Sequence, residues 1–184
     1  MRPLPRRLIA LCALLMLPAS AAPVGYSAGD GSATFDIRVL LVPVRGTIEG
    51  VSAEADVDSA DLAATTGRVT VPLVNLKTGN GLRDSHARSE VALWAEKYPN
   101  AVFTLGRLTG GRLVEGTTLA TTATGTLTVK ATTRTISVPV KATLSGAQIR
   151  VSTQFKFNPY DFDVRYPGSA TSVAVDVSFV LAAK

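Results

Sequence analysis

The sequence is poor in the residues that most often carry chemistry. It has one cysteine and one histidine among 184 residues. Cys12 lies in an N-terminal segment that we expect to be removed, which excludes disulfides, thiol nucleophiles and thiolate metal sites from the mature chain. A catalytic triad or a histidine-rich metal site would need more than His86. No G-x-S-x-G elbow and no glycine-rich phosphate loop ahead of a helix is present.

Long hydrophobic runs are also scarce, and the clearest one is at the N-terminus. Residues 8–17 are almost all apolar, but this run is far shorter than the roughly 20 residues of a membrane-spanning helix. Three arginines precede it, and Ala19-Ser20-Ala21 offers the small residues that a signal peptidase reads. We therefore predict a cleavable secretory signal in residues 1–21 and a periplasmic or secreted protein with no stable membrane span. An uncleaved anchor is the alternative.

The charge balance gives little support for a nucleic-acid partner. The chain has 19 basic and 14 acidic residues, a net charge of +5. Three of the basic residues are Arg2, Arg6 and Arg7, so removal of the signal lowers the net charge to about +2. The remaining basic residues are scattered along the chain, whereas nucleic-acid binding needs a basic patch. We expect no nucleic-acid partner.

What the chain has in abundance is alternation of apolar and polar residues, which predicts β-strands. Phe35, Ile37, Val39 and Leu41 begin the pattern. Further strands are expected near residues 45–57, 69–73, 101–108, 119–130, 135–144, 149–157 and 173–181. About eight antiparallel strands in one domain indicate a closed barrel or a sandwich. We expect residues 22–31, rich in glycine and serine, to be a flexible leader ahead of one domain at 32–184.

One segment has helical spacing instead. From about residue 82 to residue 98, apolar residues recur on one face of a helix. This stripe consists of Ala87, Val91, Trp94 and Tyr98. Pro99 disfavours helical backbone at the residue before it and should end the helix. We expect one amphipathic helix, capped by Asn80, to pack at one mouth of the barrel.

Three polar groupings are candidate sites. His86 should lie on the polar face of the helix, where it caps or anchors; a contact with a ligand head group and general-base catalysis are alternatives. Asp56, Asp58 and Asp61 resemble a calcium loop but lack its glycine and distal glutamate, which favours a solvated turn. Asp161 and Asp163 point to opposite faces if the chain is extended, so they are poorly placed as an acid–base pair.

Several motifs, in order, resemble those of the YceI-like family of exported, lipocalin-like bacterial proteins. The motifs are F-D-I-R at 35–38 with V-R-G at 44–46, R-D-S-H-A-R-S at 83–89, K-Y-P at 97–99, G-T-L-T-V at 125–129, T-R-T-I-S-V-P-V at 133–140, and N-P-Y-D-F-D-V at 158–164. The chain departs from the family where Gly29-Asp30-Gly31-Ser32 replaces D-x-x-H-S, where Ala92-Leu93-Trp94 replaces F-F-D, and where Asp163 replaces a glycine.

The resemblance implies an all-β fold with one inserted helix, an extended antiparallel barrel of about eight strands. It further implies a non-catalytic protein that binds a long-chain isoprenoid, quinone or fatty-acid-like lipid inside the barrel, with no cofactor and no metal. A homodimer is left open. The residues expected to line the barrel or its mouth are Phe35, Ile37, Val39, Arg83, His86, Arg88, Trp94, Phe103, Phe155, Phe157, Tyr160, Phe162 and Phe179.

Two other functions remain open from the sequence. One is an envelope structural or interaction module whose barrel is filled by its own side chains. The other is an enzyme that uses His86 or the Asp161–Asp163 region.

Overall fold

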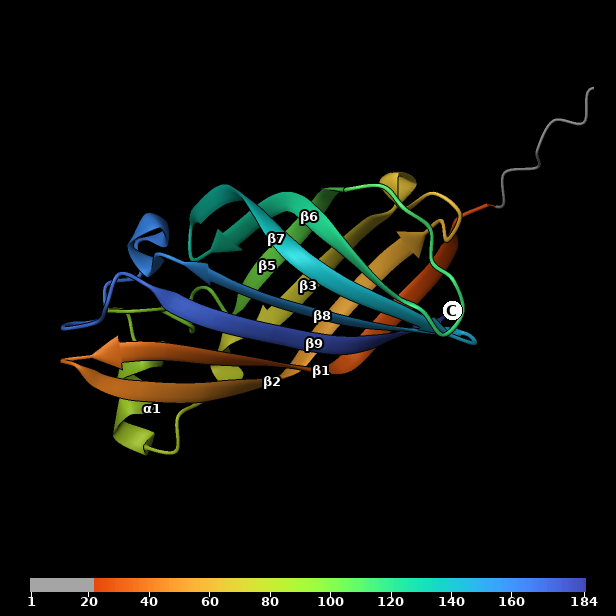
Figure 1. Ribbon diagram of the computed structural model, residues 1–184. Helices are drawn as coiled ribbons and strands as arrows, with labels where there is room; N and C mark the ends of the chain where they lie inside the picture. Colours follow the sequence, from red (N-terminus) through yellow and green to blue (C-terminus); the bar gives the residue numbers. More distant parts are fainter. Residues whose placement is uncertain (1–21) are drawn as a thin grey trace, which may run out of the picture.

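The computed structural model describes residues 22–184, and the expected signal segment at 1–21 lies outside them. The described chain is an antiparallel β-barrel with one α-helix (Figure 1). Its strands are β1 (Val24–Val39), β2 (Val42–Val57), β3 (Thr66–Pro72), β4 (Leu76–Lys77), β5 (Asn100–Leu108), β6 (Thr118–Val129), β7 (Thr132–Ser145), β8 (Gln148–Phe157) and β9 (Val173–Ala183). The helix is α1 (Gly81–Arg88), and the 3-10 turns are η1 (Leu62–Ala64), η2 (Leu73–Asn75) and η3 (Pro159–Phe162).

Eight of the strands close into a ring. The order is β1-β9-β8-β7-β6-β5-β3-β2, and β2 pairs back with β1, while the two-residue β4 adds to β2. Closure gives every long strand two partners and leaves no long edge exposed. The expected all-β barrel with one inserted helix is therefore confirmed, and closure settles the choice between a barrel and a sandwich.

The expectation of a flexible leader at residues 22–31 was wrong, because β1 begins at Val24. Tyr26 pairs with Ala55 of β2 on one side and with Ala183 of β9 on the other. Gly31 is needed for close approach: a Cβ there would lie 2.7 Å from Cβ of Phe179. Gly31, one of the glycines that suggested flexibility, thus allows β1 and β9 to pack closely.

Two exposed leucines form the turn between β1 and β2. Leu40 and Leu41 have φ angles of 48° and 70°, a left-handed conformation in which a two-residue hairpin turn favours asparagine and glycine. Their exposed fractions are 76% and 87%. Leu41, expected to continue the first strand, is therefore part of the turn.

The helix is half as long as its apolar spacing predicted. Asn80 caps α1 as expected, its side chain accepting from the backbone N–H of Arg83, but the helix ends at Arg88. Successive turns follow, with Trp94 in a left-handed conformation at φ 49° and Val91 exposed. The turns bury Ala92 and Ala95 instead of the predicted stripe. Within residues 22–184, no helix is long and apolar enough to cross a bilayer.

Candidate functional site: the barrel cavity

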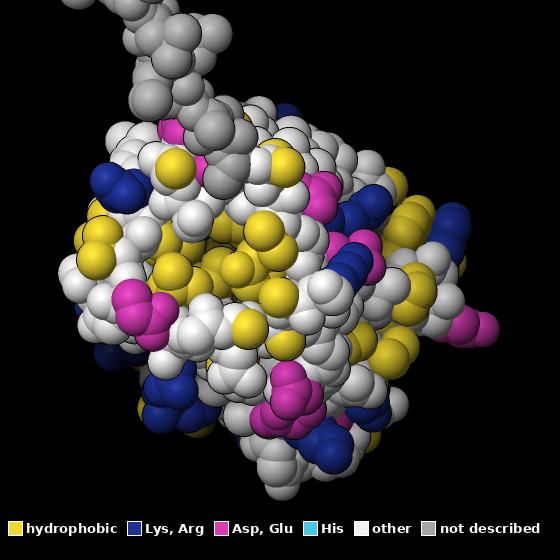
Figure 2. Space-filling model, turned by 90° about the vertical axis from the view of Figure 1, so that its right-hand side faces the viewer, with side chains coloured by type: hydrophobic (Ala, Val, Ile, Leu, Met, Phe, Trp, Pro, Cys, Tyr) yellow, Lys and Arg dark blue, Asp and Glu magenta, His cyan; other side chains and the backbone are white. Residues whose placement is uncertain are grey.

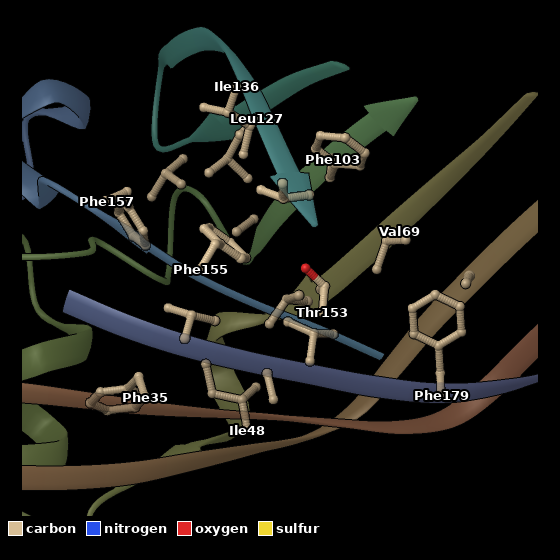
Figure 3. A pocket seen from close by; sticks show the side chains of 18 of the residues that line it. Phe35, Ile48, Val69, Phe103, Leu127, Ile136, Thr153, Phe155, Phe157 and Phe179 are labelled. Atoms are coloured by element: carbon tan, nitrogen blue, oxygen red, sulfur yellow. The ribbon is translucent and has the colours of Figure 1, made fainter. Parts of the chain in front are cut away.

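The barrel encloses an apolar cavity of about 360 Å³. Every strand from β1 to β9 contributes to its wall, and the lining is dominated by aliphatic and phenylalanine side chains (Figure 3). Among the labelled side chains of Figure 3, Thr153 alone carries an oxygen, and that hydroxyl donates to the backbone carbonyl of Pro139 at 2.7 Å. The volume falls within the range of small-molecule binding sites.

The cavity follows the barrel axis. Five alternate residues of β9 line it, namely Val173, Val175, Val177, Phe179 and Leu181. Alternate residues of a strand share one face, and each residue advances about 3.3 Å, so these five side chains extend over roughly 26 Å along the strand. The cavity is therefore long and narrow, a shape that suits an extended chain.

Glycines on the inner wall make room for phenylalanine rings. Phe35 of β1 faces Gly46 of β2 in the register, and a Cβ on Gly46 would overlap the far edge of the Phe35 ring. A Cβ on Gly125 would meet the backbone carbonyl of Thr104 first and would also lie 2.7 Å from Cζ of Phe103 on the neighbouring strand. Because the far ends of these rings reach over adjacent backbone, the rings lie along the wall. The glycines thus keep the cavity open.

One end of the barrel, which we call the η1 end, is hollowed. It is formed by the end of β2, by η1 and by the β5–β6 connection (right in Figure 1), and hydrophobic side chains line a depression there (Figure 2). Val57, Leu62 and Leu113, which belong to these three elements, all line the cavity. The lumen therefore meets the surface at this end through an apolar rim.

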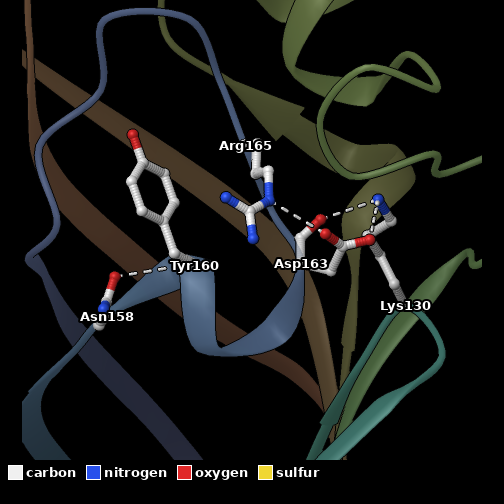
Figure 4. Close-up of polar contacts among 5 residues, drawn as sticks. All are labelled: Lys130, Asn158, Tyr160, Asp163 and Arg165. Carbon is white, nitrogen blue, oxygen red and sulfur yellow. Dashed lines mark hydrogen bonds and ion pairs between the residues drawn. The ribbon is translucent and has the colours of Figure 1, made fainter.

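The opposite end, the η3 end, is formed by η3, the loop after it and α1, and side-chain hydrogen bonds hold it together. The side chain of Asn158 accepts from the backbone N–H of Tyr160, whose hydroxyl donates to the carbonyl of Ser169 at 3.0 Å. Lys130 donates to the backbone carbonyl of Asp163, and Arg165 pairs with the Asp163 carboxylate at 3.2 Å (Figure 4). The N-P-Y-D-F-D-V motif therefore builds a structured loop.

Residues of the R-D-S-H-A-R-S motif in and after α1 also hold the η3 end together by hydrogen bonds. Asp84 is buried and accepts hydrogen bonds from the backbone N–H of Thr78 at 2.8 Å and from its hydroxyl at 2.5 Å. Those bonds, together with the positive charges of Arg88 and Arg83, hold the pKa of Asp84 below its ordinary value, although burial opposes them. Arg88 donates to the carbonyls of Val74 and Leu76.

The structure gathers eight of the thirteen sequence-predicted site residues around the cavity. These are Phe35, Ile37, Val39, Arg83, Phe103, Phe155, Phe157 and Phe179. Arg83 donates to both the hydroxyl and the carbonyl of Thr78, so its guanidinium is already engaged.

The other five lie outside the lining. His86 is exposed on α1, and Arg88 binds the backbone as described. Trp94 stacks edge-on against Tyr98, with the Lys97 amine 4.3 Å from the centre of its ring. Tyr160 bonds to Ser169, and Phe162 is buried behind Phe157, with their ring centres 5.4 Å apart.

Sequence reasoning missed part of the lining on β6 and β7. Leu127, Val129, Ile136 and Val138 all face the lumen. Their period-2 alternation was visible, but without a register it does not say which face of a strand points inward. Aromatic residues alone therefore do not mark the cavity wall, because aliphatic residues occupy equivalent inward positions.

The acidic groupings do not converge on a pocket. Asp58 accepts from the backbone N–H groups of Ala60 and Asp61, as expected of a turn. Asp161 and Asp163 are exposed, and Arg134 binds the backbone carbonyl of Asp161. Within the described part of the chain, no group of three or more histidine, cysteine, aspartate or glutamate residues could hold a metal ion.

Comparison with known proteins agrees with this architecture. A family model described as the YceI-like domain matches residues 27–183. The chain belongs to the YceI-like family. A search of the curated proteins found no match.

Several solved structures share the fold at low identity. BcnA of Burkholderia cenocepacia is 20% identical, with a TM-score of 0.71 over 82% of this chain and 95% of its own. A polyisoprenoid-binding domain of Saccharophagus degradans, implicated in plant cell wall breakdown, is 16% identical, with a TM-score of 0.70 over 88% and 99%. The YceI protein of Campylobacter jejuni is 22% identical, with a TM-score of 0.59 over 77% and 85%.

Proposed function

We propose that this YceI-like protein is an exported, non-catalytic carrier that holds a long-chain isoprenoid, quinone or fatty-acid-like lipid inside its barrel. The observation that supports the proposal most directly is the elongated apolar cavity of about 360 Å³. A cavity lined by aliphatic and aromatic side chains offers water few partners, and an apolar chain fits such a site well. The Saccharophagus degradans domain, which has this fold, is a polyisoprenoid-binding domain.

The energetics of burial favour such a ligand. Each methylene removed from water contributes about 0.8 kcal/mol, so ten of them give roughly 8 kcal/mol, which corresponds to micromolar affinity before entropic costs. Few polar contacts are then needed for binding. Selectivity would come from the length and width of the lumen and from the few hydrogen-bonding groups along it.

The alternatives have less support. An interaction module with a filled barrel would need a packed interior, whereas the interior holds a cavity. An enzyme that uses His86 would need this side chain in a pocket, whereas His86 is exposed on α1 and does not line the cavity.

A chain-length series tests the proposal. Saturated primary alcohols of increasing length, presented from cyclodextrin, compete with a fluorescent lipid probe for the purified protein. We expect the affinity to rise about fourfold for each methylene until the lumen is full. Affinity that does not depend on chain length would contradict the proposal.

Two alanines on neighbouring strands provide matched variants. Ala142 of β7 faces the lumen, and Ala120 of β6 is exposed. Ala142→Leu should shorten the longest alcohol accepted, whereas Ala120→Leu should bind the series as the wild type does. Equal effects of the two substitutions would show that the probe binds outside the lumen.

A further inference from the structure

One hydroxyl in the cavity wall has no partner. Thr65 is 5% exposed and lines the cavity, and among residues 22–184 its Oγ1 is the buried side-chain polar atom without a hydrogen bond. Burying a polar group without a hydrogen-bond partner is unfavourable. A buried hydroxyl that the fold leaves unsatisfied therefore needs an explanation.

Thr65 lies on the inner face of the barrel with its Oγ1 buried, so a ligand reaches the hydroxyl only if the side chain rotates about χ1. Its backbone is extended, with φ −69° and ψ 133°, and it directly precedes β3. Gly67, Val69 and Val71, which follow at intervals of two, all line the cavity, so Thr65 shares their face. It follows η1 and therefore belongs to the hollowed end (Figure 2).

Other inward threonines show the contrast. The hydroxyl of Thr121 donates to the carbonyl of Thr109 at 2.5 Å, and that of Thr153 donates to the carbonyl of Pro139 at 2.7 Å. Both line the cavity, and both satisfy their hydroxyls within the protein. Thr65 therefore differs from them by lacking an internal partner, not by its residue type.

We propose that the Thr65 hydroxyl binds the polar terminus of the lipid, which places the head group at the η1 end and the apolar chain toward the η3 end. This inference rests on the proposed function. The head group should be neutral and able to form a hydrogen bond, as an alcohol, a ketone or quinone, or an amide can. A hydroxyl carries no charge. Glu54 and Arg68 also border the cavity, but both side chains are exposed, and Glu54 pairs with Lys184 at 3.5 Å.

A pair of ligands that differ only in the head group tests the assignment. Hexadecanol and hexadecane, presented from cyclodextrin, compete with a fluorescent lipid probe for the purified protein. The wild type should bind the alcohol about fivefold more tightly, as expected for one net hydrogen bond. Thr65→Val should bind both ligands equally and keep the wild-type affinity for hexadecane. Thr65→Ser should retain the preference.

The control is Thr118→Val, which removes an exposed hydroxyl outside the cavity that already bonds to the hydroxyl of Thr143. This variant should keep the preference for the alcohol, and Thr65→Val should melt no lower than the wild type. An unchanged preference in Thr65→Val, with both ligands bound, would overturn the head-group assignment alone. Failure of the wild type to bind either ligand would overturn the carrier function itself.

Discussion

The two ends of the barrel differ in how their polar groups are satisfied. At the η3 end, Arg83 and Arg88 donate to the chain's own carbonyls, and the hydroxyl of Tyr160 donates to Ser169. At the η1 end, apolar side chains surround a hollow, and the hydroxyl of Thr65 has no partner among the described residues. The polar groups of the η3 end are thus used in internal hydrogen bonds, whereas the η1 end retains a hydroxyl that can bond to a ligand.

This difference changes the interpretation of the motifs. Arg83, His86, Arg88 and Tyr160 were expected to line the barrel or its mouth, as polar residues of family-like motifs. The structure engages three of them in internal hydrogen bonds and leaves His86 exposed, away from the lumen. A polar residue in a motif can thus hold a loop in place, and an unsatisfied hydroxyl elsewhere is the better sign of a ligand contact.

The largest effect should come from the buried carboxylate of the η3 end. Asp84→Ala removes the acceptor for two hydrogen bonds from Thr78 and a negative charge near Arg83 and Arg88. We expect the free energy of unfolding to fall by about 3 kcal/mol in urea denaturation. His86→Ala, on the exposed side of the same helix, should change it by less than about 0.5 kcal/mol. Equal effects of the two substitutions would mean that the hydrogen bonds of Asp84 do not stabilise the η3 end.

The same carboxylate should give stability a pH dependence. The pKa of Asp84 is lower in the folded protein than the ordinary value of about 3.9. Its contribution is therefore fully present above that value and is lost as the pH falls through the folded pKa. The stability difference between wild type and Asp84→Asn should shrink below about pH 4. A stability difference between the two proteins that grows as the pH falls would contradict a lowered pKa of Asp84.

An intermediate effect is expected where a glycine keeps the lumen open. Gly46→Ala should push the Phe35 ring off the wall, because the added Cβ overlaps the ring. We expect a loss of about 2 kcal/mol in stability and weaker binding of long alcohols. Gly29→Ala is the control, since a Cβ there meets nothing within 4 Å. If Phe35→Leu does not recover part of the loss in Gly46→Ala, the ring is not the cause.

The smallest effect should come from the β1–β2 turn. Replacing Leu40 and Leu41 by asparagine and glycine gives the turn the residues that its φ angles favour. We expect the free energy of unfolding to rise by about 1 kcal/mol in urea denaturation. Leu82→Asn removes another exposed leucine without changing a strained backbone and should have little effect. A loss of stability in the turn variant would show that the leucine side chains contribute packing.

The wall of the barrel could be predicted from the sequence, whereas the segments at its ends could not. In the strand Val173–Ala183, alternation predicts that the large apolar residues share one face, and the structure shows that this face lines the cavity. The predicted helix is longer than α1 because Ala87, Val91, Trp94 and Tyr98 match a helical period. Trp94 instead adopts a left-handed conformation, which the spacing does not reveal. Thr65 could not be singled out, since a missing hydrogen-bond partner is visible only in three dimensions.

Native mass spectrometry of residues 22–184, the chain expected after removal of the signal and purified from an exporting host, tests the central claim most directly. Solvent extraction and identification of any bound molecule would follow. The account predicts a stoichiometric adduct whose mass corresponds to a long-chain lipid with a neutral polar terminus. A mass of the protein alone, unchanged after incubation with isoprenoid alcohols, quinones and fatty acids, would contradict it.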